Sequence, residues 1–392
     1  MVTSLVASHV QLYEEFEENP LRYVTAAPSL ICAYTPPTYT VPRGAVRGAA
    51  GLRLGTRPPM IRRVTNRRYE RTGLRPEVAT LLASARAAKG EGPAPIAQMR
   101  AMAPAGAAYM NAGAPQIALE REITIDTGGA QVRALIWAPA AEPRGLPVVL
   151  HFHGGGFVWM LPESFAKPWK EVAIAAHVIV VSLDYRLAPE HPYPAALDDC
   201  VGAFRWLREH AGEIGGDPGR LAVAGESAGG GLAASTALRL IAEGDEAPAA
   251  VVAACAWLDL RDSSASFEAL GPDDPLIDSA TMDVWRRAYA PREEQWLDPL
   301  VSPVFADVSA MPPACIVTGG IDPLCEDGIT FAEKLRAAGR SVELHEYDGM
   351  PHLFWCFPPL FELNDVSARI AAFLRRELHG GAAQGAAPAR LP

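Results

Sequence analysis

Gly225-Glu226-Ser227-Ala228-Gly229 follows directly after the apolar run Leu221-Ala222-Val223-Ala224. The run is typical of a short buried strand, and the alanine-rich segment 227–242 that follows is typical of a helix. A serine between these elements lies in a sharp strand-to-helix turn, which closes only when its neighbours are small. The turn exposes the serine hydroxyl, and the N-terminus of the helix favours negative charge that develops beside it. The stretch therefore predicts that Ser227 is a nucleophile carried by an α/β sheet.

The remainder of the chain extends this sheet. Strand-like runs alternate with segments of helical periodicity, such as 194–211, 326–338 and 363–378. Such alternation predicts an α/β fold with an eight-stranded, mostly parallel sheet and helices on both of its faces. Gly128-Gly129 predicts a hairpin turn between the first two strands. The expected strands are 121–126, 132–137, 148–153, 178–183, 221–225, 251–258, 314–318 and 342–347.

The segments outside this alternation have patterns of their own. Residues 1–71 combine proline pairs, glycines and many arginines without a sustained period, which indicates a disordered or partly ordered extension. An over-long gene start, with Met60 as the true first residue, is the alternative interpretation. Residues 72–380 hold the sheet together with a helical segment, 72–115, and a proline-rich insertion, 263–311. The low-complexity tail 381–392 is expected to be disordered.

Composition excludes several classes of protein. The 392 residues carry a net charge of −10, which gives no reason to expect a nucleic-acid partner. No apolar run approaches the roughly 18–20 residues of a membrane span, and the glutamate-rich start lacks the basic and apolar regions of a secretory signal. The six cysteines are scattered, with no Cys-x-x-Cys pair. We therefore expect no membrane span and a reducing, cytoplasmic setting.

A glycine-rich loop ends the strand 148–153, in His151-Phe152-His153-Gly154-Gly155-Gly156-Phe157. Glycines let backbone N–H groups turn toward a ligand without interference from a Cβ atom. Beside a nucleophilic serine, such a loop supplies an oxyanion hole, and we expect Gly155, Gly156 and Ala228 to be the donors. The two histidines share a strand face, but no third ligand has convincing spacing. We therefore predict no metal, and we expect His153 to steady the loop by hydrogen bonds.

The base and the acid are expected after later strands, because the loops at the carboxyl ends of parallel strands meet at one edge of the sheet. His352 lies in the loop just after the last predicted strand, and Asp322 follows the preceding one. Asp327 is the rival acid, but it lies at the start of a helix, where a negative charge is favourable without any catalytic role. The order Ser227, Asp322, His352 is the order expected in α/β hydrolases.

These motifs resemble the hormone-sensitive-lipase-like family of α/β hydrolases, of the bacterial arylesterase and acetylesterase type. The resemblance spans about residues 74–378 and rests on 153–156, 184–196, 225–230, 322–324 and 349–352. It implies the α/β-hydrolase fold with a helical cap from 72–115 and 263–311, and a serine esterase site without metal or cofactor. Ser227 would be the nucleophile, His352 the base and Asp322 the orienting acid. Two departures are Glu226, where the family more often has Asp, and Leu353-Phe354-Trp355 after the histidine.

The expected reaction is hydrolysis of a small-molecule carboxylic ester with a small-to-medium acyl group, through an acyl-enzyme intermediate. Phe157, Trp159 and Trp355 are the candidate substrate-binding residues, since aromatic side chains near the motifs indicate an enclosed apolar site. An amidase, peptidase or lactonase on the same triad is the first alternative, and a non-catalytic small-molecule receptor is the second. The resemblance also suggests a homodimer.

Overall fold

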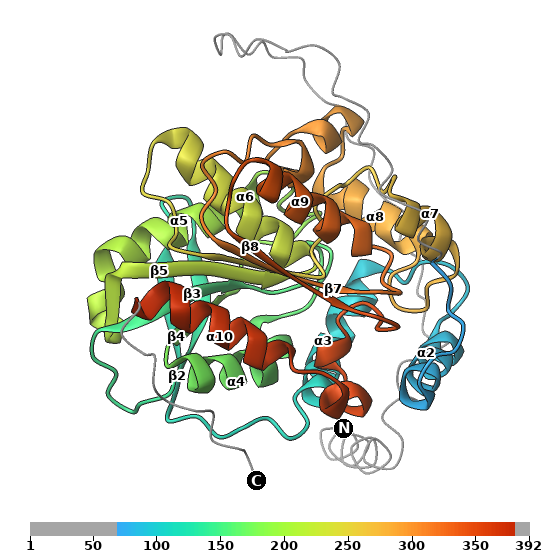
Figure 1. The fold of residues 1–392 in the computed structure, drawn as a ribbon, viewed down its shortest axis with the longest axis horizontal. Helices are drawn as coiled ribbons and strands as arrows, with labels where there is room; N and C mark the ends of the chain where they lie inside the picture. The colour runs from blue at the N-terminus through green and yellow to red at the C-terminus, as the bar shows by residue number, and fades with distance from the viewer. Residues whose placement is uncertain (1–68, 381–392) are drawn as a thin grey trace, which may run out of the picture.

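The computed structural model describes residues 69–380, which form one eight-stranded sheet flanked by helices (Figure 1). The strand order across the sheet is β1-β2-β4-β3-β5-β6-β7-β8. The strands are β1 (Leu119–Asp126), β2 (Gln131–Ala138), β3 (Leu146–Phe152), β4 (Ile179–Leu183), β5 (Gly216–Glu226), β6 (Val251–Ala254), β7 (Ala314–Gly319) and β8 (Val342–Tyr347).

The sheet is mostly parallel, as the alternation of elements predicts. β2 pairs antiparallel with both β1 and β4, and every pair from β4 across to β8 is parallel. The predicted hairpin joins β1 to β2, and the N–H of Thr127 donates to the carbonyl of Ala130 across its turn at 2.9 Å. All the carboxyl ends of the parallel strands therefore lie along one edge of the sheet.

Helices cover both faces of the sheet (Figure 1). α4 (Ala166–Ala176) and α10 (Val366–His379) pack together on one face. The other face carries α5 (Ala195–His210), α6 (Ala228–Glu243) and α9 (Cys325–Ala337). Successive side chains of a strand point to opposite faces, so Val149 and Leu150 are both fully buried but belong to two separate apolar clusters. Burial on both faces explains why the strands are almost continuously apolar.

Four further helices lie beside the sheet: α2 (Pro76–Ala88), α3 (Ile96–Met110), α7 (Ala265–Leu270) and α8 (Ser279–Tyr289). Hydrogen bonds and an ion pair join the end of α2 to the segment between α7 and α8. Lys89, which directly follows α2, forms an ion pair with Asp278 at 2.9 Å, and Arg86 donates to the carbonyl of Asp273 at 3.0 Å. Segments almost 190 residues apart in the sequence are thus joined, and Figure 1 shows α2 and α7 on the same side of the molecule.

One predicted strand is too long. The prediction 251–258 is wrong beyond Ala254, because Cys255 has a φ of 41°, which no β-strand residue can adopt. Beyond that point the backbone turns, and the N–H of Trp257 donates to the carbonyl of Ser227 at 3.0 Å. The predictions for the extension 1–71 and the tail 381–392 fall outside the described residues, except for 69–71.

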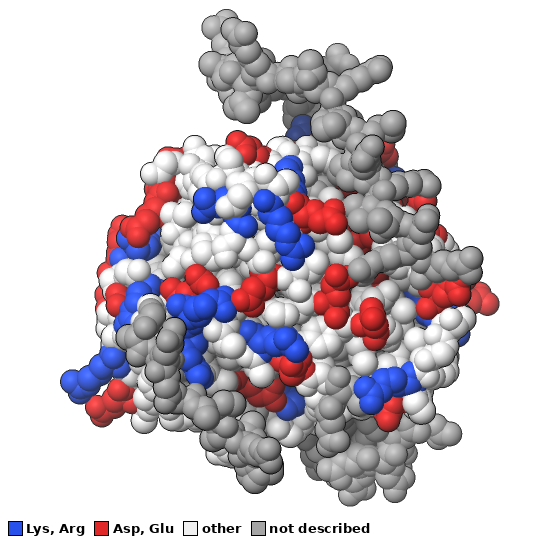
Figure 2. All heavy atoms as spheres, viewed as in Figure 1, with Lys and Arg blue, Asp and Glu red and all other residues white. Residues whose placement is uncertain are grey.

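Apolar packing, not surface charge, holds this domain together. Basic and acidic side chains are interspersed over the face that Figure 2 displays. Exposed ion pairs contribute at most about 1 kcal/mol each, whereas burial of one large apolar side chain contributes roughly 1.5–3 kcal/mol. Within residues 69–380, no helix has both the length and the apolar character needed to cross a membrane.

The N-terminus of α8 offers a test of this arrangement. The Asp278 carboxylate accepts hydrogen bonds from the N–H groups of Ala280 and Thr281, both at 3.0 Å. Removing such a cap costs about 0.5–2 kcal/mol, and we expect Asp278→Ala to lower the free energy of unfolding by that amount. Urea denaturation measures it. Asp278→Asn keeps an oxygen for the cap but gives up the charge opposite Lys89 and the acceptor of the Thr281 hydroxyl, so a loss as large as that of the alanine variant would contradict the cap.

Candidate active site

Ser227 lies at the turn between β5 and α6, with a φ of 56° and a ψ of −122°. A non-glycine residue in this region is strained by about 1–3 kcal/mol, and neighbouring structure has to hold it there. Here the N–H of Ser227 donates to the carbonyl of Ala254 at 2.9 Å, and its own carbonyl accepts from Trp257. The turn directs the hydroxyl away from the strand, toward the loops beyond the sheet.

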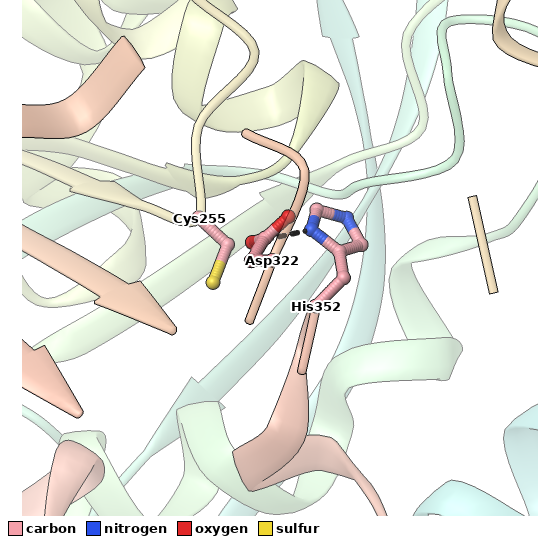
Figure 3. Close-up of side chains that lie close together, drawn as sticks. All are labelled: Cys255, Asp322 and His352. Carbon is pink, nitrogen blue, oxygen red and sulfur yellow. Dashed lines mark hydrogen bonds and ion pairs between the residues drawn. The ribbon is translucent and has the colours of Figure 1, made fainter. Parts of the chain in front are cut away.

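A chain of two hydrogen bonds runs from the Ser227 hydroxyl through His352 to Asp322. The Nε2 atom of His352 lies 3.0 Å from the Ser227 Oγ. Its Nδ1 atom lies 2.8 Å from an Asp322 carboxylate oxygen, a contact that Figure 3 shows. The second oxygen of Asp322 accepts from the N–H of Leu324 at 2.9 Å. All three side chains are at most 5% exposed. In this orientation the imidazole can take the hydroxyl proton, and the carboxylate stabilises the imidazolium that results.

The parallel sheet brings these three residues together from distant parts of the chain. Ser227 follows β5, Asp322 follows β7 and His352 follows β8, so each lies just beyond the carboxyl end of a strand. Ser227 and His352 are 125 positions apart in the sequence. The structure thus places all three predicted residues within hydrogen-bonding distance, in the sequence order expected for this fold.

The predicted oxyanion loop approaches the same point. Gly155 and Gly156 have φ values of 113° and 59°, and a Cβ atom on either would collide with its surroundings. On Gly155 it would meet the carbonyl of Trp159, and on Gly156 it would meet the indole of Trp285 in α8. Among residues 69–380, no group accepts a hydrogen bond from the N–H of Gly155, Gly156 or Ala228. These three donors are therefore available to an oxygen that carries negative charge.

His153 steadies this loop, as the sequence predicts. Its Nδ1 atom lies 2.7 Å from the carbonyl of Gly154, and its ring stacks on Tyr185 with the ring centroids 4.4 Å apart. The Tyr185 hydroxyl donates in turn to the carbonyl of His153 at 2.7 Å. Complete burial lowers the pKa of His153, so the ring is neutral and its Nδ1–H can donate to that carbonyl.

The three candidate substrate-binding residues lie in different surroundings. Phe157 is 2% exposed and stacks on Tyr289, with the ring centroids 3.8 Å apart. Trp355 is also buried and lies edge-on to Phe354. Trp159 is half-buried, and its indole lies 6.4 Å from that of Trp285 in α8. The structure therefore brings only Trp159 of the three to a partly accessible position near the glycine loop.

Asp327, the rival acid, lies elsewhere. One of its carboxylate oxygens accepts from the N–H groups of Leu258 and Asp259, both at 3.0 Å. These bonds join the start of α9 to the segment that follows β6. Burial raises the pKa of this carboxyl well above its usual range, and the neighbouring Asp259 contributes to the rise. Asp327 therefore has a structural explanation, and it makes no hydrogen bond to His352.

Cys255 lies close to the acid and the base (Figure 3). One potential ligand atom from each of Cys255, Asp322 and His352 lies within 4.8 Å of the other two. Thiol, carboxylate and imidazole groups can all bind metal ions. Burial and the nearby carboxylate raise the pKa of the Cys255 thiol, which therefore keeps its proton. A protonated thiol is a poor ligand, and the Nδ1 atom of His352 is already engaged with Asp322. The geometry is better explained by the serine–histidine–aspartate chain than by a metal centre.

Sequence reasoning missed one group of buried polar residues beside the site. Glu226 precedes the nucleophile, and its carboxylate accepts from the N–H of Gly154 and from the side chains of His151 and Trp169. The signal in the sequence was a charged residue at a turn that is otherwise made of small ones. Its partners come from a separate strand and from α4, so only the fold identifies them.

This fold and this chain of hydrogen bonds define a class, the hydrolases that use a nucleophilic serine on an α/β sheet. A family model described as the alpha/beta hydrolase fold matches residues 149–356. The chain belongs to the α/β-hydrolase family, and its relatives agree with the resemblance to the hormone-sensitive-lipase-like group.

Two relatives come from Mycobacterium tuberculosis. Carboxylesterase NlhH is 36% identical over 272 residues, which cover 68% of this chain and 84% of the relative. Esterase LipI is 40% identical over 252 residues, which cover 63% of this chain and 78% of the relative.

Solved structures of esterases have the same fold. A hyperthermophilic esterase from the archaeon Pyrobaculum calidifontis superposes with a TM-score of 0.72 at 32% identity, covering 77% of this chain and 98% of the other. The ester-hydrolase EH1AB1 from the metagenome of Lake Arreo was solved with a derivative of bipyridine phosphonate. It gives a TM-score of 0.73 at 32% identity, covering 78% of this chain and all of the other.

The lowered pKa of His153 predicts a pH effect on stability. Below its ordinary pKa of 6.5 the unfolded chain binds a proton at this ring that the folded chain does not, so stability falls as the pH drops. His153→Phe removes that proton and should flatten the dependence below pH 6.5 by up to about 1.4 kcal/mol per pH unit. Urea denaturation between pH 5 and 8 measures the slope.

Tyr185→Phe is the control for this measurement. It removes the hydrogen bond to the His153 carbonyl but leaves the imidazole in place, so it should lower stability and keep the wild-type slope. Equal slopes in the wild type and in His153→Phe would show that burial does not hold this ring neutral.

Proposed function

We propose that this protein is a serine carboxylic-ester hydrolase that acts through an acyl-enzyme intermediate. The observation that carries the proposal is the hydrogen-bonded chain from Ser227 through His352 to Asp322, beside three backbone N–H groups free to bind an oxyanion. The named activities of its relatives support the ester as the bond cleaved, since they include a carboxylesterase and an esterase.

The mechanism follows from the positions of these groups. The Ser227 oxygen attacks the ester carbonyl while the Nε2 atom of His352 takes its proton, and the Asp322 carboxylate stabilises the imidazolium. The N–H groups of Gly155, Gly156 and Ala228 bind the negatively charged oxygen of the tetrahedral intermediate. His352 then protonates the leaving alcohol, and water attacks the acyl-enzyme by the same route.

We propose that the acyl group is small to medium in size. Trp285 lies directly against Gly156, one of the proposed oxyanion donors, and the half-buried Trp159 lies near it. Two large indoles beside the oxyanion loop would leave limited room for a long chain. Trp159 is the proposed substrate contact that the geometry supports best, because it is partly exposed. Phe157 and Trp355 are buried, and we propose that they support the residues that line the pocket.

We also propose that α2, α3 and the insertion 263–311 form a cap on the hydrolase domain 72–380. The contacts between them support this division. Arg71 and Lys89 bind the insertion through Asp274 and Asp278, and Trp285 of the insertion covers Gly156. Arg100 of α3 donates to the carbonyl of Val158 at 2.7 Å, just after the glycine loop. The cap would thus touch the oxyanion loop from two sides.

Two further proposals concern the cellular compartment and the assembly. We propose a cytoplasmic enzyme, and the buried free thiols support a reducing compartment. A homodimer is proposed on the family resemblance alone. The thiols belong to Cys200, Cys255, Cys315, Cys325 and Cys356.

Hydrolysis of p-nitrophenyl esters with acyl chains from C2 to C12 tests the proposal. We expect the rate to peak at short or medium chains and to fall by at least about 10⁴-fold in Ser227→Ala, because loss of the nucleophile removes the acyl-enzyme route. Stopped assays with purified protein measure kcat/KM for each chain. Equal rates in the two proteins would contradict the proposal, and a peak at C12 would contradict the small acyl pocket.

The amidase alternative is separated by a matched pair of substrates. An ester and an anilide with the same acyl group share the first chemical step, so a comparison of their kcat/KM values isolates the leaving group. A preference for the anilide would favour the amidase. Hydrolysis of neither, by folded protein, would favour a lactone or a receptor function.

A further inference from the structure

Glu226 is a buried carboxylate directly before the nucleophile, and the proposed mechanism does not use it. Its side chain is 1% exposed and receives hydrogen bonds on both oxygens. One oxygen lies 2.9 Å from the N–H of Gly154, and the other lies 3.1 Å from the indole Nε1 of Trp169. The Nε2 atom of His151 lies 3.0 Å from that second oxygen. Three donors therefore converge on one buried carboxyl group.

Burying a carboxylate costs free energy unless both of its oxygens accept hydrogen bonds, so a buried carboxylate at this position suggests a specific role. None of its three donors belongs to β5 or α6, the elements that form the nucleophile turn. Gly154 and His151 come from the end of β3 and its loop, and Trp169 comes from α4. Glu226 is therefore the side chain that ties the turn to the glycine loop.

His151 anchors this link in the sheet. Its Nδ1 atom lies 2.8 Å from the hydroxyl of Ser182 on β4, while its Nε2 atom faces Glu226 at the end of β5. β4, β3 and β5 are neighbours in the sheet, and His151 is in register with Ser182. The polar chain from Ser182 to Gly154 thus crosses three adjacent strands directly beneath the loop. Its position is fixed by backbone pairing on both sides.

The two ends of the link lie within two residues of the proposed oxyanion donors. Glu226 is separated from Ala228 only by Ser227, and Gly154 is bonded directly to Gly155. The N–H of Gly154 points to the carboxylate, which leaves the following N–H groups free to turn toward the site. The Glu226 side chain thus bridges the segment that carries the loop donors and the turn that carries the Ala228 donor.

We propose that Glu226 is a positioning residue that sets the geometry of the oxyanion hole, by holding the glycine loop at a fixed distance from the nucleophile turn. This inference rests on the proposed function, since it assumes that Gly155, Gly156 and Ala228 bind the oxyanion. A displaced donor weakens the bond to the charged oxygen in the transition state more than it weakens binding of the uncharged ester. Glu226 therefore acts on kcat and leaves KM nearly unchanged.

Glu226→Gln is the sharpest variant. All three donors face carboxylate oxygens, so an amide NH₂ in either orientation opposes at least one N–H group. Complete loss of one oxyanion donor costs about 10²–10³-fold in kcat, and we expect a displaced loop to cost about 10–100-fold. Glu226→Asp keeps an acceptor-only carboxylate on a side chain one methylene shorter, so it should fall between the wild type and Glu226→Gln.

Two readouts separate positioning from a general loss of structure. The first is the division of the effect between kcat and KM for the preferred p-nitrophenyl ester. The second is inhibition by a trifluoromethyl ketone with the same acyl chain, which adds to the serine and puts an oxyanion in the hole. We expect the ketone affinity of both variants to fall by the same factor as kcat, with KM changed less than about threefold.

Asp199→Asn is the matched control. Asp199 is also a fully buried carboxylate that accepts from a backbone N–H, that of Arg186 at 2.9 Å, but it makes no bond to the glycine loop. It should lower the melting temperature and leave kcat within about twofold. Wild type and Ser227→Ala in the same assay report separately on the proposed function. Wild-type kcat and ketone affinity in a folded Glu226→Gln would overturn the inference; if that variant does not fold, the same result in Glu226→Asp would overturn it.

Discussion

The site depends on one strained backbone position, the positive-φ conformation of Ser227 between β5 and α6. A strain of about 1–3 kcal/mol persists only where surrounding structure over-determines the conformation. Here the neighbouring strand β6 and the segment after it hold the N–H and the carbonyl of Ser227. Those contacts in turn require the backbone to leave the sheet at Cys255, where φ is 41°. The early end of β6 and the exposed nucleophile are thus two results of one constraint.

The parallel sheet converts this local feature into a site. Its strands are buried on both faces, so polar side chains with chemical roles lie in the loops beyond their carboxyl ends. The acid, the base and the glycine loop all reach the nucleophile from that edge. Because these groups are almost completely buried, the attraction between an imidazolium and the Asp322 carboxylate is stronger than it would be in water.

Local patterns in the sequence predict much of this arrangement. The small residues around Ser227, the glycine loop and the late positions of Asp322 and His352 are all readable, because each depends on a short stretch and on the direction of parallel strands. The end of β6 was not readable, because 251–258 is apolar throughout and the bonds to Ser227 and Asp327 that hold its bend come from distant parts of the chain. The partners of Glu226 were hidden for the same reason, since they come from other elements. Phe157 lies in the core because Tyr289, from the distant α8, stacks on it.

The most direct test of the account is to identify the residue that a covalent probe modifies. A fluorophosphonate forms a stable bond only with an activated serine, and intact-mass and peptide mass spectrometry locate the adduct. We expect one adduct per chain, on the peptide that contains Ser227, and its loss in both Ser227→Ala and His352→Ala. A probe attached to another residue, or labelling that persists in the Ser227→Ala protein, would contradict the assignment of Ser227 as the nucleophile.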